Sequence, residues 1–246
     1  MTPGMTETGI SFQSVFLRRG GATLFDALSL ELTESRIGLI GDNGAGKSSL
    51  LRLACGLLAP DKGRVTVHGV DTRADRLRLP SLVGILFQSP DDQIIFPTVV
   101  EELAFSLTAL GEERRAARRR AATYLDERGL GAWTDRAVGS LSQGQRQRLC
   151  LMALDIMGPR TLLLDEPFAS LDLPAQARLV KYIRTTERQV LLSSHVLEPL
   201  LEFERVLWLD QGRIRADGPG REVCAAYRAY VQDHVTEGMD DAQLLS

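Results

Sequence analysis

The sequence lacks a hydrophobic run long enough to cross a bilayer. A span needs about 20 consecutive apolar residues, and the leucine-rich stretches are interrupted by Arg52 and by the polar residues 193–195. The opening MTPGMTET provides neither the basic start nor the apolar stretch of a signal peptide. These absences exclude an integral membrane protein and a secreted protein as interpretations of the whole chain.

Cysteine and net charge are also scarce. The three cysteines, Cys55, Cys150 and Cys224, have no second cysteine or histidine at metal-ligand spacing, so we expect small buried side chains in a reducing cytosol. The 29 basic and 32 acidic residues leave a net charge of −3, which offers no general attraction for nucleic acid or anionic lipid. We therefore expect no nucleic-acid partner.

What the sequence does contain is an ordinary globular composition, with 44% hydrophobic and 25% charged residues among 246. This length fits one large domain or two small ones. Short apolar segments typical of buried strands occur at residues 29–32, 36–40, 65–67, 83–87, 161–164, 189–192 and 206–209. Helical patterns occur at 47–57, over most of 98–154, and from 221 to about 235. The alternation predicts an α/β fold with a parallel sheet covered on both faces, into which 98–154 is inserted.

The sequence GDNGAGKS, from Gly41 to Ser48, fits the phosphate-loop pattern G-x-x-x-x-G-K-[ST] between a predicted strand and a predicted helix. Glycines let successive N–H groups point inward at phosphate oxygens, and the helix N-terminus adds its positive end. Lys47 supplies a cation for the β- and γ-phosphates, and the Ser48 hydroxyl can ligate Mg²⁺. The predicted nucleotide contacts are Asp42, Asn43, Gly44, Ala45, Gly46, Lys47, Ser48 and Ser49.

Two carboxylates, Asp165 and Glu166, follow the apolar run 161–164 and precede Pro167. Ligands of open parallel sheets bind beyond the carboxyl ends of the strands. Asp165 is therefore placed to hold Mg²⁺, and Glu166 to polarise the water that attacks the γ-phosphate.

The segment LSQGQ, residues 141–145, resembles the signature sequence of ATP-binding-cassette (ABC) ATPases, which usually reads LSGGQ. Other family elements follow the same order along the chain: Gln88 matches the Q-loop, Ser170-Leu171-Asp172 the D-loop, and His195 the switch histidine. The resemblance covers about residues 10–223. It implies a P-loop NTPase (RecA-like) core with an antiparallel β subdomain and an inserted α-helical signature subdomain. We divide the single domain 1–246 into a core of about 1–97 and 155–246 and a helical part of about 98–154.

The resemblance also implies roles. ATP and Mg²⁺ are the expected cofactors, with Ser48, Gln88 and Asp165 as magnesium ligands. Glu166, His195 and Gln88 are the expected catalytic residues, and Asp172 is the D-loop residue. The signature residues of one subunit contact the γ-phosphate held by another, which implies a homodimer or a heterodimer with a paralogous ATPase; these residues are Ser142, Gln143, Gly144 and Gln145.

Two positions depart from the family pattern. Gln143 replaces the first glycine of the signature pair, but Glu166 and His195 are present, so we still expect a competent site. The family usually stacks adenine on an aromatic residue upstream of the phosphate loop. Alignment by eye puts Arg19 at that position, where a guanidinium plane can stack on a base; Phe16 is the alternative.

The sequence after Gln88, SPDDQIIF, continues into TVVEELAF and is similar to ATPases of energy-coupling-factor (ECF) importers. This resemblance implies a peripheral subunit on the cytoplasmic face of the cell membrane, serving separate membrane subunits. A transmembrane T component would bind a Q-loop groove near Asp91 and Asp92, and another membrane component would bind the substrate. Biotin is the favoured cargo, and cobalt or nickel ions are the alternative.

Other interpretations stay open. The same cassette occurs in soluble ATPases that act on DNA or the ribosome, although this chain has one cassette and no room for a long coiled coil between phosphate loop and signature. A small-molecule kinase would share the phosphate loop but not the signature. The arginine-rich run at 114–120 is interpreted first as an exposed helix face, with contacts to lipid or membrane partners as the alternative. Trp133 and Trp208 are assigned to packing.

Overall fold

The computed structural model describes residues 8–169 and 171–238. Its central sheet has the strand order β10-β9-β3-β8-β7-β6. Neighbouring strands are parallel except for the β9–β10 pair, which is antiparallel. These strands are β3 (Arg36–Ile40), β6 (Val83–Leu86), β7 (Thr161–Asp165), β8 (Gln189–Ser193), β9 (Arg205–Asp210) and β10 (Arg213–Gly218). The predicted α/β fold with a buried parallel sheet is confirmed.

A second, antiparallel sheet has the order β2-β1-β4-β5. Its strands are β1 (Ile10–Arg19), β2 (Ala22–Leu32), β4 (Lys62–Val67) and β5 (Val70–Asp71). Helix α1 (Lys47–Ala54) lies between the two sheets, and its leucines join a core with residues from both, including Phe12 and Leu163. The predicted antiparallel subdomain is therefore present, and α1 connects it to the parallel sheet.

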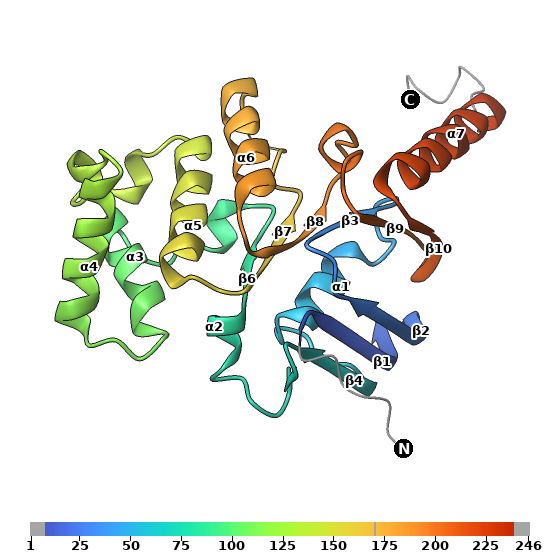
Figure 1. Ribbon diagram of the computed structural model, residues 1–246, viewed down its shortest axis with the longest axis horizontal. Coiled ribbons are helices and arrows are strands. Elements are labelled where there is room, and N and C mark those ends of the chain that lie inside the picture. Colours follow the sequence, from blue (N-terminus) through green and yellow to red (C-terminus); the bar gives the residue numbers. More distant parts are fainter. Residues whose placement is uncertain (1–7, 170, 239–246) are drawn as a thin grey trace.

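The remaining helices lie on both faces and at the ends of the parallel sheet, and the shortest of them packs Leu79 into the same core as α1. They are α2 (Leu79–Leu82), α3 (Val99–Thr108), α4 (Arg114–Glu127), α5 (Gln143–Met157), α6 (Leu173–Thr185) and α7 (Gly220–Gly238). Short 3₁₀ helices are η1 (Pro90–Asp92), η2 (Gly131–Trp133), η3 (Val138–Ser140) and η4 (Glu198–Leu200). Helices α3, α4 and α5 gather at one end of the molecule and α7 at the other (Figure 1). Helices α3 to α5 share their own apolar core, so the inserted helical subdomain is present; its exact boundaries stay a prediction.

Several details differ from the sequence-based expectations. Strand β2 begins at Ala22 and not at residue 29, and β1 has no counterpart among the predicted strands. The helix expected to reach Leu57 ends at Ala54, because Gly56 adopts φ 74°. The strand expected to end at Phe87 ends one residue earlier. Strand β10 was not predicted, because its residues alternate between exposed and half-buried and leave only a weak apolar pattern. Cys150 and Cys224 are buried and Cys55 is half-buried, as expected for small side chains in the core.

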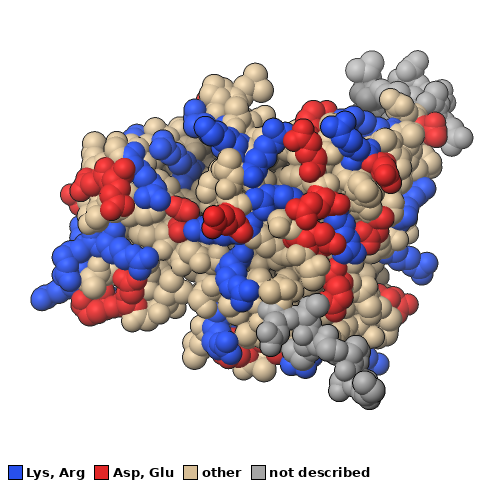
Figure 2. Space-filling model, in the orientation of Figure 1, with Lys and Arg blue, Asp and Glu red and all other residues tan. Residues whose placement is uncertain are grey.

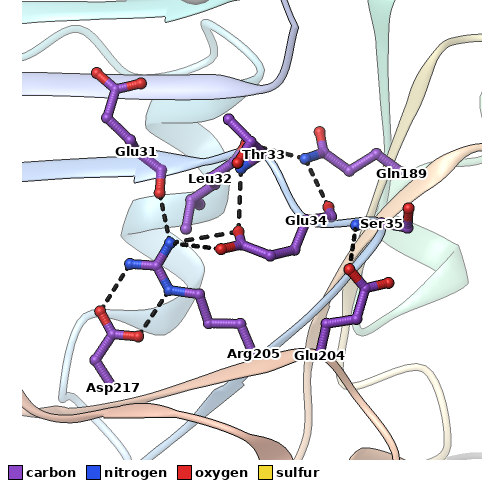
Figure 3. Close-up of polar contacts among 9 residues, drawn as sticks. All are labelled: Glu31, Leu32, Thr33, Glu34, Ser35, Gln189, Glu204, Arg205 and Asp217. Carbon is purple, nitrogen blue, oxygen red and sulfur yellow. Dashed lines mark hydrogen bonds and ion pairs between the residues drawn. The ribbon is translucent and has the colours of Figure 1, made fainter.

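Arg205 anchors the connection between the two sheets (Figure 3). Its guanidinium donates to both carboxylate oxygens of Asp217 at 2.7 Å, to the carbonyl oxygen of Glu31 at 2.7 Å and to Glu34 Oε1 at 3.1 Å. Nearby, the Gln189 amide donates to the carbonyl oxygens of Leu32 and Glu34, both at 3.0 Å. The segment that leaves β2 and enters β3 is therefore held by β8 and β9, and Asp217 of β10 orients the Arg205 guanidinium.

None of the helices in the described residues is both long and apolar enough to cross a bilayer.

His68, at φ 47° in the turn after β4, also links the two sheets, and its partner Thr161 donates a hydrogen bond to Gln189 of the network just described. Its Nδ1 accepts the Gly9 N–H at 3.1 Å, and its Nε2 lies 2.8 Å from the Thr161 hydroxyl. Burial, with repulsion from Arg160, lowers the pKa of His68 from 6.5 to about 4. Between about pH 4 and pH 6.5, the His68 ring is therefore neutral in the folded protein but protonated in the unfolded chain.

We predict that His68 makes the protein less stable as the pH falls from about 6.5 to 4. In this window the unfolded state binds more protons, so the free energy of unfolding rises with pH. His68→Asn removes the titrating ring while suiting the left-handed backbone. Urea unfolding at pH 7 and pH 5 should show a smaller pH-dependent difference for the variant; equal differences would contradict the prediction.

Candidate functional site

The phosphate loop turns sharply between β3 and α1. Gly41 has φ 136°, and a Cβ at this position would lie 2.0 Å from the carbonyl oxygen of Leu209 in β9. Gly46, the residue before α1, has φ 112°. Both positions need glycine, because left-handed backbone and close approach exclude a side chain. The loop is thus held tightly against β9, with its N–H groups at the start of a helix.

Lys47 is buried, with 7% of its surface exposed. Its ammonium donates to the carbonyl oxygens of Gly41 at 2.6 Å and Asp42 at 3.0 Å. Burial lowers the pKa of Lys47, and the nearby carboxylates of Glu166 and Asp165 oppose that shift. The loop's own carbonyl groups therefore hold the ammonium group over the curve of the loop.

Most predicted site residues meet in one open pocket of about 170 Å³. The pocket lies where the phosphate loop meets the carboxyl ends of β6, β7 and β8, as expected for an open parallel sheet. It is lined by Leu24, Asp42, Asn43, Gly44, Gly46, Lys47, Ser48, Ser49, Gln88, Asp165, Glu166 and His195. Of the predicted phosphate-loop contacts, Ala45 alone is missing from this lining; it is buried, and its carbonyl oxygen accepts the Gly212 N–H.

Asp165 and Glu166 differ in their surroundings. Asp165 is 4% exposed, and its Oδ1 has no hydrogen-bond partner among the described residues. A buried oxygen of this kind, beside the Ser48 hydroxyl and the Gln88 amide, fits a cation that takes oxygen ligands, as Mg²⁺ does.

Glu166, at φ 47°, is held by His195. The His195 N–H donates to Glu166 Oε2 at 3.1 Å, and its ring Nε2 lies 3.2 Å from Glu166 Oε1. The backbone N–H of Glu166 donates to the carbonyl oxygen of Ser193 in β8. These contacts orient a carboxylate at the edge of the pocket, where it can accept a proton from a bound water.

The signature residues begin helix α5. Ser142 is its N-cap, with its hydroxyl accepting the Gln145 N–H while the Gln145 side chain accepts the Ser142 N–H. Gln143 and Gly144 occupy the first helical positions. The described residues that line the pocket include none of these four, so the structure does not bring them to the phosphate loop of the same chain.

The D-loop residue Asp172 is the N-cap of α6 and accepts the Ala175 N–H at 2.8 Å. Ser170 lies outside the described residues.

The adenine-contact prediction gains no support from the geometry. Arg19 is an exposed residue at the end of β1, paired with Ala22, and does not line the pocket. Phe16 lies under the Lys62 ammonium, 5.9 Å from the ring centre. The residue from this region that does line the pocket is Leu24. The roles of Arg19 and Phe16 stay predictions.

A groove of about 460 Å³ adjoins the pocket on the Q-loop side. It is lined by Ser48, Arg52, Leu57, Phe87, Gln88, Ser89, Asp92 and Asp165. Asp92 therefore lines this groove, and its role in binding a partner stays a prediction. Asp91 instead forms an ion pair with Arg146 at 3.0 Å, so it already has a basic partner within the chain.

Sequence reasoning missed three residues that contact the site. Arg146 ties η1 to α5, and buried Gln147 donates to the carbonyl oxygen of Pro167, next to Glu166. Tyr227 of α7 donates to Asp42 of the phosphate loop. Arg146 and Gln147 follow the signature directly, which was an available signal; nothing in the sequence pointed to Tyr227.

Comparisons with known proteins identify the chain's relatives. The ABC transporter family model matches residues 25–169. The biotin transport ATP-binding protein BioM of Rhodobacter capsulatus is 50% identical over 223 residues, covering 91% of this chain and 95% of the relative. BioM of Rhizobium etli is 39% identical over 219 residues, which cover 89% of this chain and 97% of that relative. In fold, the chain resembles cbiO1 from Clostridium perfringens, part of the ABC transporter complex cbiONQ. The TM-score is 0.74 at 23% identity, and the match covers 93% of this chain and 95% of cbiO1.

Both the family model and the identity to BioM span the phosphate loop, the acidic pair and the signature. The chain therefore belongs to the ABC transporter family, as one of its ATPases.

Proposed function

We propose that this chain is the ATP-binding and ATP-hydrolysing subunit of an ECF-type importer, with biotin as the favoured cargo and a cobalt or nickel ion as the alternative. The observation that carries the proposal is the pocket shared by Lys47, Asp165, Glu166 and His195, in a chain half identical to a biotin transport ATP-binding protein. Cargo selection belongs to a separate membrane component, because the pocket is suited to phosphate and has few apolar walls.

The phosphate loop binds the β- and γ-phosphates through its backbone N–H groups and the Lys47 ammonium. Ser48, Gln88 and Asp165 supply oxygen atoms that would hold Mg²⁺, which when bound neutralises charge on the phosphates. Asp165 suits this role because its unpartnered Oδ1 is buried at the end of β7.

Glu166 accepts a proton from the attacking water. As the proton leaves, the water oxygen bonds to the γ-phosphorus, and the bond between the γ-phosphorus and the β–γ bridging oxygen breaks. The His195 N–H holds Glu166 Oε2, and its ring Nε2 lies 3.2 Å from Glu166 Oε1. In the proposed mechanism the same ring also contacts the γ-phosphate, since His195 lines the pocket. Positioning supplies most of the rate in phosphoryl transfer, which is why two contacts on one carboxylate matter.

The signature completes the site from a second subunit, either another copy or a paralogous ATPase. Ser142 and the Gly144 N–H lie at the N-terminus of α5, where the helix favours an anion. The capping bond uses the Ser142 oxygen as an acceptor, so its hydroxyl proton is still available for a phosphate. Two ATP molecules are thus enclosed between two subunits, with Asp172 of the D-loop at the interface.

The groove beside the Q-loop is proposed to receive a helix of the transmembrane T component on the cytoplasmic face of the membrane. It combines apolar surface from Leu57, which is 62% exposed, with opposite charges on Arg52 and Asp92. Helix η1 carries both Asp91 and Asp92, and the ion pair to Arg146 links that helix to α5. The wall of the groove is therefore connected to the signature.

A soluble ABC ATPase acting on nucleic acid or the ribosome is the second candidate. Lys and Arg residues alternate with Asp and Glu over the face drawn in Figure 2, without a continuous basic track for a phosphate backbone. Two arginines of the 114–120 run are also paired, Arg118 with Asp135 and Arg120 with Glu112. The mixed surface favours the transporter.

Replacing Lys47 by alanine should remove most nucleotide affinity, because the phosphates lose their buried cation. A loss of at least tenfold is expected for charged hydrogen bonds of this kind. Calorimetric titration with ATP or ADP measures it, and Lys181→Ala on the exposed face of α6 is the matched control. Unchanged binding by Lys47→Ala would remove the phosphate role from the loop.

Glu166→Gln should retain ATP binding, trap the ATP-bound dimer and lower turnover by at least about a hundredfold, the usual scale of general-base catalysis. Phosphate release and gel filtration with ATP measure the two effects. Glu187→Gln, an exposed change between α6 and β8, should behave as the unmodified chain. Rapid hydrolysis by Glu166→Gln would exclude Glu166 as the base.

The Asp91→Ala/Asp92→Ala variant should capture less T component when the subunits are co-expressed, since it loses a charge in the groove and the ion pair that positions η1. Asp135→Ala is the control, because it removes another exposed carboxylate paired with an arginine. Equal recovery of the T component by both variants would argue against this groove as the docking site.

A further inference from the structure

Helix α7 packs against the end of the parallel sheet formed by β9 and β10 (Figure 1). Two residues of its first turns, Val223 and Cys224, are buried in the core of the parallel sheet. Farther along, the rings of Tyr227 and Tyr230 pack on Trp208 of β9, with centroid separations of 5.2 and 5.0 Å. These contacts fix the first half of the helix, and with it the direction in which the Tyr227 ring points.

Arg215 of β10 closes this aromatic cluster. Its guanidinium lies 4.5 Å from the Trp208 ring centre and 4.0 Å from that of Tyr230, and it pairs with Asp210 at 3.0 Å. Stacked cations and rings of this kind limit side-chain motion. The Tyr227 hydroxyl is therefore presented from a rigid base and not from a free helix end.

The Tyr227 hydroxyl donates to Asp42 Oδ1 at 2.9 Å, across 185 positions of sequence. Asp42 is the second residue of the phosphate loop and lines the pocket. Its carbonyl oxygen also accepts the Lys47 ammonium at 3.0 Å. Asp42 is thus held in two ways: its side chain bonds to Tyr227 of α7, and its backbone carbonyl bonds to Lys47.

The charge of Asp42 makes this contact consequential. Its carboxylate lies in a loop built to bind polyphosphate, so it opposes the ligand electrostatically wherever it turns toward the pocket. A hydroxyl donor fixed on α7 stabilises the carboxylate in the orientation that faces the helix. The N–H groups of the loop and Lys47 are then left to the phosphates.

We propose that Tyr227 is a positioning residue of the phosphate loop, which raises nucleotide affinity by holding the Asp42 carboxylate against α7. This inference rests on the proposed phosphate-binding role of the loop. It gives α7 a part in nucleotide binding, although none of the described side chains of α7 lines the pocket.

The test compares Tyr227→Phe with Tyr230→Phe, each of which removes one hydroxyl and keeps the ring in the same cluster. Tyr227→Phe should raise the Kd for ATP and ADP about threefold to tenfold, the scale of one partly exposed hydrogen bond. KM for ATP should rise by the same factor while kcat in the assembled transporter changes less than twofold. Tyr230→Phe should bind nucleotide like the unmodified chain.

The Asp42→Asn background tells whether Tyr227→Phe weakens binding by releasing the Asp42 carboxylate or by lowering the general stability of the protein. With the carboxylate charge gone, adding Tyr227→Phe should change the Kd by less than twofold. Amide hydrogen exchange gives a second readout: the loop N–H groups at residues 43–48 should exchange faster in Tyr227→Phe and normally in Tyr230→Phe.

Three results would overturn the inference: an unchanged Kd in Tyr227→Phe, the same loss of affinity with and without Asp42→Asn, or a lower kcat at unchanged KM. Lys47→Ala distinguishes this failure from that of the proposed function. If Lys47→Ala loses nucleotide and Tyr227→Phe does not, the loop binds phosphate without help from α7; if Lys47→Ala still binds, the phosphate role itself is wrong.

Discussion

The backbone of the phosphate loop passes so close to strand β9 that no side chain fits at residue 41. The carbonyl oxygen of Leu209 occupies the space a Cβ would need, and the Gly212 N–H bonds to the loop at Ala45. These contacts set the curve of the loop before any ligand binds. The direction of its N–H groups and the place of Lys47 follow from that curve, so the site depends on the β9–β10 hairpin behind it.

The other side chains of the pocket reach the loop because β8 pairs in register with β3 on one side and with β7 on the other. Leu39 pairs with Ser193, and Ser193 pairs with Asp165. Residues just beyond these pairs, Glu166 and His195, are thereby brought within hydrogen-bonding distance across two neighbouring strands. Parallel pairing places the carboxyl ends of all these strands at one edge, which makes a polar site at the end of an apolar sheet.

Helix α5 joins this site to the surface beside it. Its first turn carries the signature, Arg146 reaches η1, and Gln147 reaches the segment that follows Glu166. Helix α7 makes the corresponding link at the opposite end of the sheet through Tyr227. The phosphate loop and its carboxylates are thus braced from two helices that lie at opposite ends of the molecule.

The sequence by itself determined the α/β class, the phosphate loop, the acidic pair and the order of the family's motifs. Each of these can be recognised in short runs of adjacent residues, because such a run specifies both its local backbone conformation and the chemical groups that it carries. It could not place α7 on the loop, pair Asp91 with Arg146, or show that β10 extends the sheet, since these depend on contacts between distant segments. Only the tertiary structure decides these contacts between distant segments. Packing and strand register bring the side chains together, and neither can be read from the residues next to them in the sequence.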